Sequence, residues 1–150
     1  MSTILYREAT SEDIPFLAKI RAKNSGTEEG WTNRITGYLE GTIHPQQALK
    51  PRIIYVALDG SSIIGFIAGH LTRRLECEGE LEWIDVAEGY RRAGIASELV
   101  RVLAKWFIRQ SVHKICVDPG NEAARKFYRS NGAENLNQHW MYWDDIRDVL

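Results

Sequence analysis

Residues 79–96 read GELEWIDVAEGYRRAGIA, and their pattern says more about the fold than any other part of the chain. Its first part, residues 79–86, is predicted to be a strand, and a short turn then leads into a helix. Small residues such as Ala93 and Gly94 let the backbone approach a ligand closely, and the first N–H groups of a helix have no acceptor within it. The stretch therefore predicts an anion site suited to a pyrophosphate, with Arg91 and Arg92 close enough to add positive charge, whereas an ordinary loop and helix start is the alternative.

The helix after this turn is strongly amphipathic. Between residues 93 and 109 an apolar stripe faces one way and charged residues gather opposite; the stripe consists of Ile95, Leu99, Val102, Leu103 and Trp106. Residues 113–117 then read as a buried strand. Strand, helix and strand form a βαβ unit that crosses right-handedly into a parallel pair, and open sheets bind ligands at the carboxyl ends of such strands.

The remaining pattern predicts shorter elements and mostly antiparallel pairing. The Asp59-Gly60 turn is a strong hairpin signal, and Gly132 is placed as a left-handed helix end. We expect strands at 4–7, 52–58 and 62–71, helices from Thr10 or Ser11, at 31–40 and at 121–131, and one or two closing strands and a final turn in 133–150. The fold class is α+β: a mixed, mostly antiparallel sheet of about six or seven strands with helices on both faces.

Length and charge exclude several classes. The 150 residues predict one domain spanning 1–150, and 19 basic against 20 acidic residues disfavour a polyanion binder that works by counterion release. No run is long enough for a bilayer span and the N-terminus lacks an apolar signal core, so we expect a cytoplasmic protein with no membrane or nucleic-acid partner. Cys77 and Cys116 show no disulfide or metal spacing, and no metal is expected.

Two motifs carry a resemblance to a known family. Residues 86–96 resemble the acetyl-CoA-binding motif of the GNAT superfamily of N-acetyltransferases, whose core is Arg/Gln-x-x-Gly-x-Gly/Ala. Residues 121–132, NEAARKFYRSNG, look like the later motif of the family, and residues 7–15 look like its usual opening. Three positions depart from the family pattern: Glu88 stands where Pro is common, Arg92 where Gly is common, and Ala133 where an aromatic residue is usual. The first two fall in the phosphate turn, where they could alter its affinity without removing the backbone donors.

The resemblance implies acetyl-CoA as co-substrate and direct transfer of its acetyl group to an amine in a ternary complex. It implies that CoA lies against the strand end, the phosphate turn and the later helix. The residues expected to bind it are Ile84, Asp85, Val86, Arg91, Arg92, Ala93, Gly94, Ile95, Ala96, Ser97, Asn121, Ala124, Phe127 and Tyr128.

The resemblance also suggests two groups for the transfer step. The family polarises the thioester carbonyl with a backbone N–H on the strand before the phosphate turn, where that strand bulges and splays from its parallel neighbour; by position this is Val86 or a close neighbour. Tyr128 matches the family's tyrosine and would protonate the leaving thiolate, although it could instead be a packing aromatic beside Phe127.

Four alternating glutamates supply candidates for the base. In a regular strand, the period of two puts Glu76, Glu78, Glu80 and Glu82 on one face, where like charges raise one another's pKa. For Glu76 and Glu78 we prefer a solvated hairpin face. Glu80 is the leading candidate because it stands six residues before Val86, the position where some members of the family carry their glutamate, and Glu82 is the second. Water-mediated deprotonation is the remaining option.

The acceptor site is harder to read. In the superfamily the first two helices and their loop form much of the acceptor wall, which here contains Glu28, Glu29, Trp31 and Asn33. Carboxylates beside an indole suit a cationic small-molecule or peptidic amine, whereas a solvated loop with one anchoring Trp explains the same residues. The rival class is a non-catalytic acyl-CoA-binding sensor or regulatory module. The sequence leaves the oligomeric state open, and a homodimer is common among similar proteins.

Overall fold

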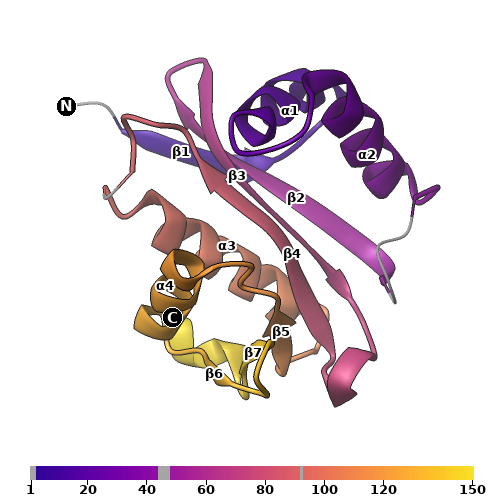
Figure 1. The fold of residues 1–150 in the computed structure, drawn as a ribbon, viewed down its shortest axis with the longest axis vertical. Helices are drawn as coiled ribbons and strands as arrows, with labels where there is room; N and C mark the ends of the chain where they lie inside the picture. Colours follow the sequence, from indigo (N-terminus) through magenta and orange to yellow (C-terminus); the bar gives the residue numbers. More distant parts are fainter. Residues whose placement is uncertain (1–2, 44–47, 92) are drawn as a thin grey trace.

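The computed structural model describes residues 3–43, 48–91 and 93–150, whose chain forms one twisted sheet with helices on both faces (Figure 1). The strands are β1 (Ile4–Glu8), β2 (Leu49–Asp59), β3 (Ser62–Leu71), β4 (Gly79–Val86), β5 (Ile115–Val117), β6 (Glu134–Asn135) and β7 (Met141–Trp143). The sheet order is β1-β2-β3-β4-β5-β7-β6, and β4–β5 is its parallel pair. The helices are α1 (Ile14–Ala22), α2 (Glu28–Glu40), α3 (Ile95–Arg109) and α4 (Glu122–Ser130), with short 3-10 turns η1 (Ser11–Asp13), η2 (Arg74–Glu76) and η3 (Ile146–Val149). The predicted α+β class is confirmed.

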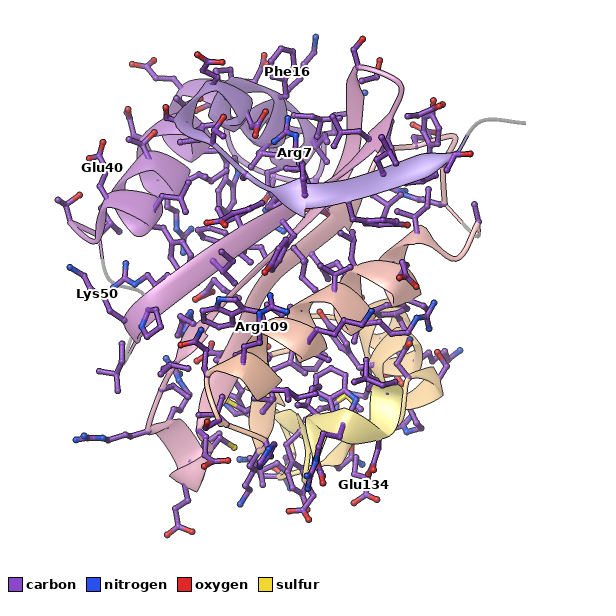
Figure 2. All side chains as sticks on the ribbon, turned by 180° about the vertical axis from the view of Figure 1, so that it is seen from behind. Arg7, Phe16, Glu40, Lys50, Arg109 and Glu134 are labelled. Atoms are coloured by element: carbon purple, nitrogen blue, oxygen red, sulfur yellow. The ribbon has the colours of Figure 1, made fainter. Side chains whose placement is uncertain are left out.

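Two apolar layers hold the helices against the sheet. On one face, Leu17 of α1 and Ile35 of α2 pack with Phe66 and Trp83 of the sheet. On the other face the apolar stripe of α3 packs on the opposite side of the same strands, together with Tyr128 of α4. The outer sides of the first two helices carry Phe16 and Glu40, which point away from the sheet (Figure 2).

Most element bounds agree with the sequence pattern within a few residues. The strand at 79–86 and the one at 62–71 are reproduced as predicted, and Gly132 has the expected left-handed conformation, with φ +96°. The second helix begins at Glu28, earlier than the predicted 31, because Thr27 caps it by accepting a hydrogen bond from the Gly30 N–H. Among the residues described, no helix combines the length and the apolar character needed to cross a membrane.

Strand β4 carries a bulge at Glu82. Trp83 pairs with Ala68 and Leu81 pairs with Gly69 on adjacent β3 positions, so Glu82 is an extra residue without a partner in the register. A bulge breaks the strict period of two. Residues on either side of Glu82 therefore cannot be assigned to sheet faces from spacing alone.

The parallel pairing of β4 and β5 is short. It joins Gly79 to Ile115, Glu80 to Cys116 and Leu81 to Val117, where β5 ends. Strand β4 continues to Val86. Beyond Leu81 the two strands therefore part, as the family resemblance predicted, and the edge of β4 that faced β5 is left open to a ligand.

Candidate functional site: the cleft between β4 and α4

A cleft of about 700 Å³ lies where β4 and β5 separate. One wall is the second half of β4, the opposite wall is the loop after β5 with the start of α4, and the phosphate turn closes one end. The lining residues are Arg21, Asn24, Glu82, Trp83, Ile84, Asp85, Val86, Arg91, Ala96, Asp118, Pro119, Gly120, Asn121, Ala123, Ala124, Phe127 and Tyr128. Ten of the predicted site residues are in this set.

The open edge of β4 presents backbone donors to the cleft. The N–H of Ala87 donates to the carbonyl of Ile64 on β3 at 2.7 Å, and the pairing from Trp83 to Val86 is regular. Because successive N–H groups of a strand point to opposite edges, those of Val86 and Ile84 are directed away from β3, towards the opening. This direction fits the predicted role of a donor at Val86 or a neighbour.

The phosphate turn begins helix α3 on a left-handed glycine. Gly94 is the N-cap residue with φ +78°, and a Cβ built on it would meet no atom within 4 Å. The first turn of α3 includes Ile95, Ala96 and Ser97. Gly94 does not block a ligand from reaching the N–H groups of this turn. Ala93 and Gly94 are exposed, whereas Ile95 is buried in the core. The predicted contribution of Arg92 lies outside the described residues.

Two side chains fix the turn. The Tyr90 hydroxyl donates to Asp59 Oδ2 at 2.7 Å, which anchors the turn to the end of β2. Arg91 Nε donates to the carbonyl of Val86 at 3.2 Å, so the guanidinium is held at the mouth of the cleft. The turn can therefore offer one arginine and a helix N-terminus to an anionic ligand.

Tyr128 stands on the opposite wall. The residue is 4% exposed, and its ring packs edge-on against Phe127 and Trp143. The Asn121 side chain caps α4 by accepting from the Ala124 N–H at 2.8 Å, which fixes the helix that carries Tyr128. Burial, and secondarily the charge of Asp85, raise the pKa of Tyr128, so its hydroxyl is protonated at neutral pH.

The glutamates do not share one environment. Glu76 belongs to the turn η2 and has φ +61°, while Glu78 precedes β4 and accepts the N–H groups of His113 and Lys114. The prediction that all four carboxylates alternate along one strand face is therefore wrong. A tight turn comes before β4, and the bulge at Glu82 interrupts the alternation of side chains within β4.

Glu80 and Glu82 occupy different positions relative to the cleft. Glu82 is half-buried and lines the cleft, whereas Glu80 is 4% exposed and is not among the residues that line it. Burial and then the charge of Glu80 raise the pKa of Glu82 to about 7, against the lowering effect of Arg34, Arg74 and Arg21. A carboxyl group with this pKa can accept a proton near neutral pH.

Helix α1 and the turn that follows it contribute two cleft residues that the sequence pattern did not indicate. Arg21 Nη1 and Asn24 Nδ2 each donate to the Asp85 carboxylate at 2.9 Å. Burial raises the pKa of Asp85, and Arg21 opposes that rise. These partners are more than 60 positions apart in the chain, so local spacing carries no signal of their contact.

The residues predicted for the acceptor wall lie at the start of α2. Glu28, Glu29 and Asn33 are exposed, and Trp31 is 8% exposed. The Trp31 ring packs edge-on against Trp83 and is contacted by the guanidinium groups of Arg21 and Arg34, at 4.4 and 4.9 Å from its centroid. In this structure the indole thus binds two arginines of the same chain.

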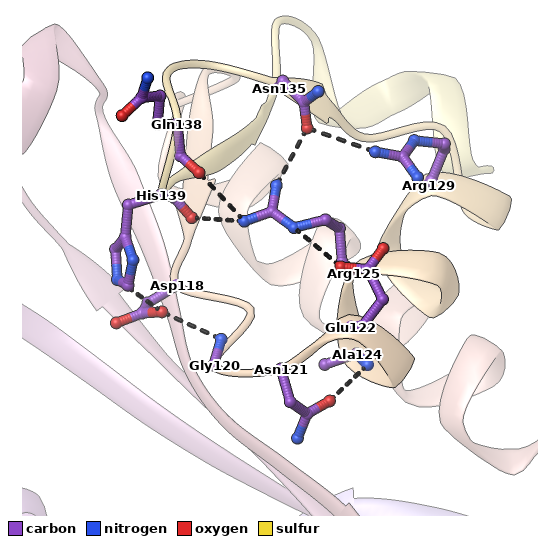
Figure 3. A network of polar contacts seen from close by, with 10 residues as sticks. All are labelled: Asp118, Gly120, Asn121, Glu122, Ala124, Arg125, Arg129, Asn135, Gln138 and His139. Atoms are coloured by element: carbon purple, nitrogen blue, oxygen red, sulfur yellow. Dashed lines mark hydrogen bonds and ion pairs between the residues drawn. The ribbon is translucent and has the colours of Figure 1, made fainter.

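The loop between β6 and β7 contacts α4 and Asp118, a residue that lines the cleft. Figure 3 shows Arg125 of α4 donating to the Asn135 side chain and to the carbonyls of Gln138 and His139. His139 Nε2 lies 3.0 Å from Asp118 Oδ1, in the loop after β5 (Figure 3). Next to it, Trp140 is stacked by Arg74 of η2 at 4.7 Å. The loop therefore contacts both the segment before β4 and the segment after β5.

The comparisons with known proteins agree with this geometry. Residues 21–133 match the model of the acetyltransferase (GNAT) family. The chain belongs to the GNAT family of acetyltransferases. The match includes the open edge of β4, the phosphate turn and α4, and it covers every residue that lines the cleft. No curated protein matches the chain significantly.

Solved structures show the GNAT fold over nearly the whole chain. An acetyltransferase of Thermus thermophilus matches with a TM-score of 0.72 at 15% identity, covering 95% of this chain and 99% of that one. The PaiA N-acetyltransferase of Thermoplasma acidophilum, solved in complex with coenzyme A, gives 0.69 at 17% identity with 95% and 99% coverage. A ribosomal-protein-alanine N-acetyltransferase of Brucella melitensis gives 0.67 at 21% identity with 93% and 99% coverage.

Proposed function

We propose that this GNAT protein is an N-acetyltransferase, a single catalytic domain that moves the acetyl group of acetyl-CoA to an amine by direct attack in a ternary complex. The observation that carries the proposal is the separation of β4 from β5. It leaves backbone donors, Tyr128 and Glu82 around one cleft, next to a helix N-terminus suited to phosphate.

The cleft residues fit acetyl-CoA from its phosphates to its thioester. The pyrophosphate would bind at the first turn of α3 beside Arg91, and the pantetheine arm would pair with the open edge of β4. Asn121, Ala124 and Phe127 would line the other side. The small side chain of Ala124 and the left-handed Gly94 leave room for a ligand that passes close to the backbone.

The N–H groups of Val86 and Ile84 would polarise the thioester carbonyl. Backbone donors directed at an oxygen that gains charge during the reaction stabilise the transition state without needing to reorganise. Acetyl-CoA supplies the acyl group and the thiolate leaving group.

Glu82 would take the first proton. An alkylammonium acceptor gives a proton to the Glu82 carboxylate, and the free amine attacks the thioester carbon. As the C–N bond forms and the C–S bond breaks, the Tyr128 hydroxyl gives its proton to the thiolate. The Tyr128 phenolate then takes the second proton lost from the acceptor nitrogen, which restores the phenol. One proton leaves through Glu82 for each acetyl group transferred, so atoms and charges balance.

The roles of the two glutamates follow from their burial. Glu82 lines the cleft and can meet the acceptor, whereas Glu80 lies behind it and contacts Arg74 and His70. We therefore assign Glu82 as the base and Glu80 as a positioning residue, which reverses the order of preference given by sequence position.

The acceptor would approach the cleft between the start of α2 and the β6–β7 loop. Exposed carboxylates at Glu28 and Glu29 favour a cationic amine at that entrance, either a small molecule or the end of a peptide. One structural neighbour is named a ribosomal-protein-alanine N-acetyltransferase, which makes a peptide amine worth testing first.

The deciding experiment measures thiol release from acetyl-CoA with a panel of peptides, polyamines, amino acids and aminoglycosides. Mass spectrometry then identifies the acetylated product. We expect release with at least one cationic amine and loss of release in Glu82→Gln. Acetyl-CoA binding without release from any amine would refute the enzyme and favour an acyl-CoA sensor. Reaction of only uncharged or anionic acceptors would refute the proposed entrance.

A further inference from the structure

Two buried polar residues behind Glu80, Tyr38 and His70, have no role in the reaction proposed above. His70 is fully buried on β3, opposite Glu80 in the register, and Tyr38 of α2 is fully buried beside it. The Tyr38 hydroxyl lies 2.8 Å from His70 Nδ1, and His70 Nε2 lies 3.5 Å from Glu80 Oε1. Because burying a polar group is costly, a buried Tyr-His-Glu series is not explained by packing alone.

Donors and acceptors in this series fit one arrangement. Burial raises the pKa of Tyr38, so its hydroxyl keeps its proton. If that hydroxyl donates to Nδ1, the neutral imidazole carries its own proton on Nε2, which faces the Glu80 carboxylate. Tyr38 would thus select the tautomer in which His70 can donate towards Glu80.

Arg74 reinforces the same carboxylate. Its Nε lies 3.2 Å from Glu80 Oε1, and its guanidinium also stacks on Trp140 of the β6–β7 loop. His70 and Arg74 therefore place nitrogen atoms within 3.5 Å of the same Glu80 oxygen, which holds the carboxylate in position.

The Glu80 carboxylate lies next to Glu82. Carboxylate oxygens of Glu80 and Glu82 and a ring nitrogen of His70 lie within 4.8 Å of one another. The bulge at Glu82 brings about this proximity, because it adds a residue between the positions paired with Gly69 and Ala68. A fixed negative charge at this distance disfavours a second one, so Glu82 retains its proton to a higher pH than an ordinary glutamate.

We propose that His70, oriented by Tyr38, is a positioning residue that holds the Glu80 carboxylate beside Glu82 and thereby controls when Glu82 is free to accept a proton. The role of Glu82 as the catalytic base rests on the proposed function. The effect of His70 on the protonation of Glu82 does not. Glu80, Arg34, Arg74 and Arg21 are the charged groups that act on Glu82, and His70 acts on it through Glu80.

The same three groups have the spacing of metal ligands. In this structure the Arg74 guanidinium already lies against Glu80, and a positive charge there opposes a divalent cation. We therefore infer that the cluster controls the protonation of Glu82. The experiment below distinguishes this role from metal binding.

The test is a carboxyl ¹³C NMR titration of the whole protein labelled on glutamate, in EDTA and without substrates. Glu82→Gln identifies the Glu82 resonance, which we expect to titrate with a midpoint of about 7. In His70→Leu and in Tyr38→Phe, which keeps the ring, the midpoint should fall by roughly half to one pH unit, because the Glu80 carboxylate is no longer held beside Glu82 and repels its charge less. His70→Gln retains an N–H donor and should restore most of the wild-type midpoint.

Matched controls separate this effect from general disturbance. His113→Leu removes a histidine elsewhere, Glu76→Gln removes an exposed glutamate, and neither should move the Glu82 midpoint. If the midpoint is unchanged in both His70→Leu and Tyr38→Phe while these variants remain folded, His70 has only a structural role and the proposal is refuted. A midpoint that shifts when EDTA is replaced by Zn²⁺ or Mn²⁺ would instead identify a metal site.

The titration and the activity assay can fail independently. A protein that never releases thiol but shows the expected midpoint shifts refutes the proposed function and supports the His70 inference. Conversely, an active enzyme whose Glu82 midpoint ignores His70 and Tyr38 supports the function and refutes the inference.

Discussion

Arg21 and Asp85 form a salt bridge of 2.9 Å that joins the end of α1 to the cleft edge of β4, 64 positions along the chain. Their side chains are only 21% and 11% exposed. The pair therefore fixes α1 against β4. Because both side chains are largely buried, the loss of one partner leaves the charge of the other buried without it.

The first prediction concerns this pair. Arg21→Met keeps most of the apolar length but removes one of the two side chains seen to donate to Asp85, so we expect the free energy of unfolding at pH 7 to fall by about 2–3 kcal/mol. Burial raises the pKa of Asp85 and Arg21 lowers it, so the pKa should rise further in the variant. The loss of stability should then shrink as the pH falls and Asp85 becomes protonated.

Urea unfolding of both proteins at pH 7 and pH 5 measures this difference. Arg147→Met is the matched control, because Arg147 pairs with Asp145 at the surface, and that variant should stay within about 0.5 kcal/mol of the wild type. Equal losses for the two variants, or a loss for Arg21→Met that grows on acidification, would contradict the interpretation.

The second prediction concerns the proton donor. Tyr128→Phe removes only the hydroxyl from a ring held by Phe127 and Trp143, so we expect kcat to fall roughly 10²-fold while the Kd for acetyl-CoA changes little. Tyr142→Phe, on β7, is the control and should keep the wild-type kcat. Steady-state kinetics and calorimetry separate the two quantities, and an unaltered kcat in Tyr128→Phe would remove Tyr128 from the mechanism.

The sequence predicted the parts of the site that depend on short spacing. The strand ending at Val86, the turn at Gly94 and the helix carrying Tyr128 each follow from local patterns. The different positions of Glu80 and Glu82 do not, because they depend on the register between β3 and β4. One bulge residue changes which carboxylate reaches the cleft, and no period within a single strand reveals it.

The same reason explains the residues that were missed. Arg21 and Asn24 reach Asp85 only because α1 packs over β4, and His70 meets Glu80 only through strand pairing. A family resemblance indicates which positions of this chain belong to a motif. It does not indicate which other residues contact them. Long-range contacts of this kind are seen only in the three-dimensional structure.

The third prediction concerns the phosphate turn. Gly94→Ala places a Cβ on a residue with φ +78°, which should cost about 1 kcal/mol of stability. It should also weaken acetyl-CoA binding roughly 10-fold, because the added methyl group obstructs the approach of phosphate to the first turn of α3.

The hairpin glycine provides the control for strain. Gly60 has φ +60° and, like Gly94, would meet no atom within 4 Å of an added Cβ. Gly60→Ala should lose similar stability in thermal unfolding while its acetyl-CoA Kd stays at the wild-type value. Equal affinities for both alanine variants would show that the turn does not hold the phosphates.

The last prediction is the pH dependence of turnover. Since the pKa of Glu82 is raised to about 7, its carboxylate is available as a base above that pH and is lost as the pH falls. We expect kcat/KM to decline on the acid side with a midpoint of about 7. In Glu80→Gln the repulsion between the carboxylates is absent, so the acid limb should move to lower pH while much of the activity remains. In Glu82→Gln the same limb should disappear and the rate should fall roughly 10²-fold or more. A limb that persists unchanged in Glu82→Gln would assign the titration to the acceptor amine or to another residue, and Glu82 would no longer be the base.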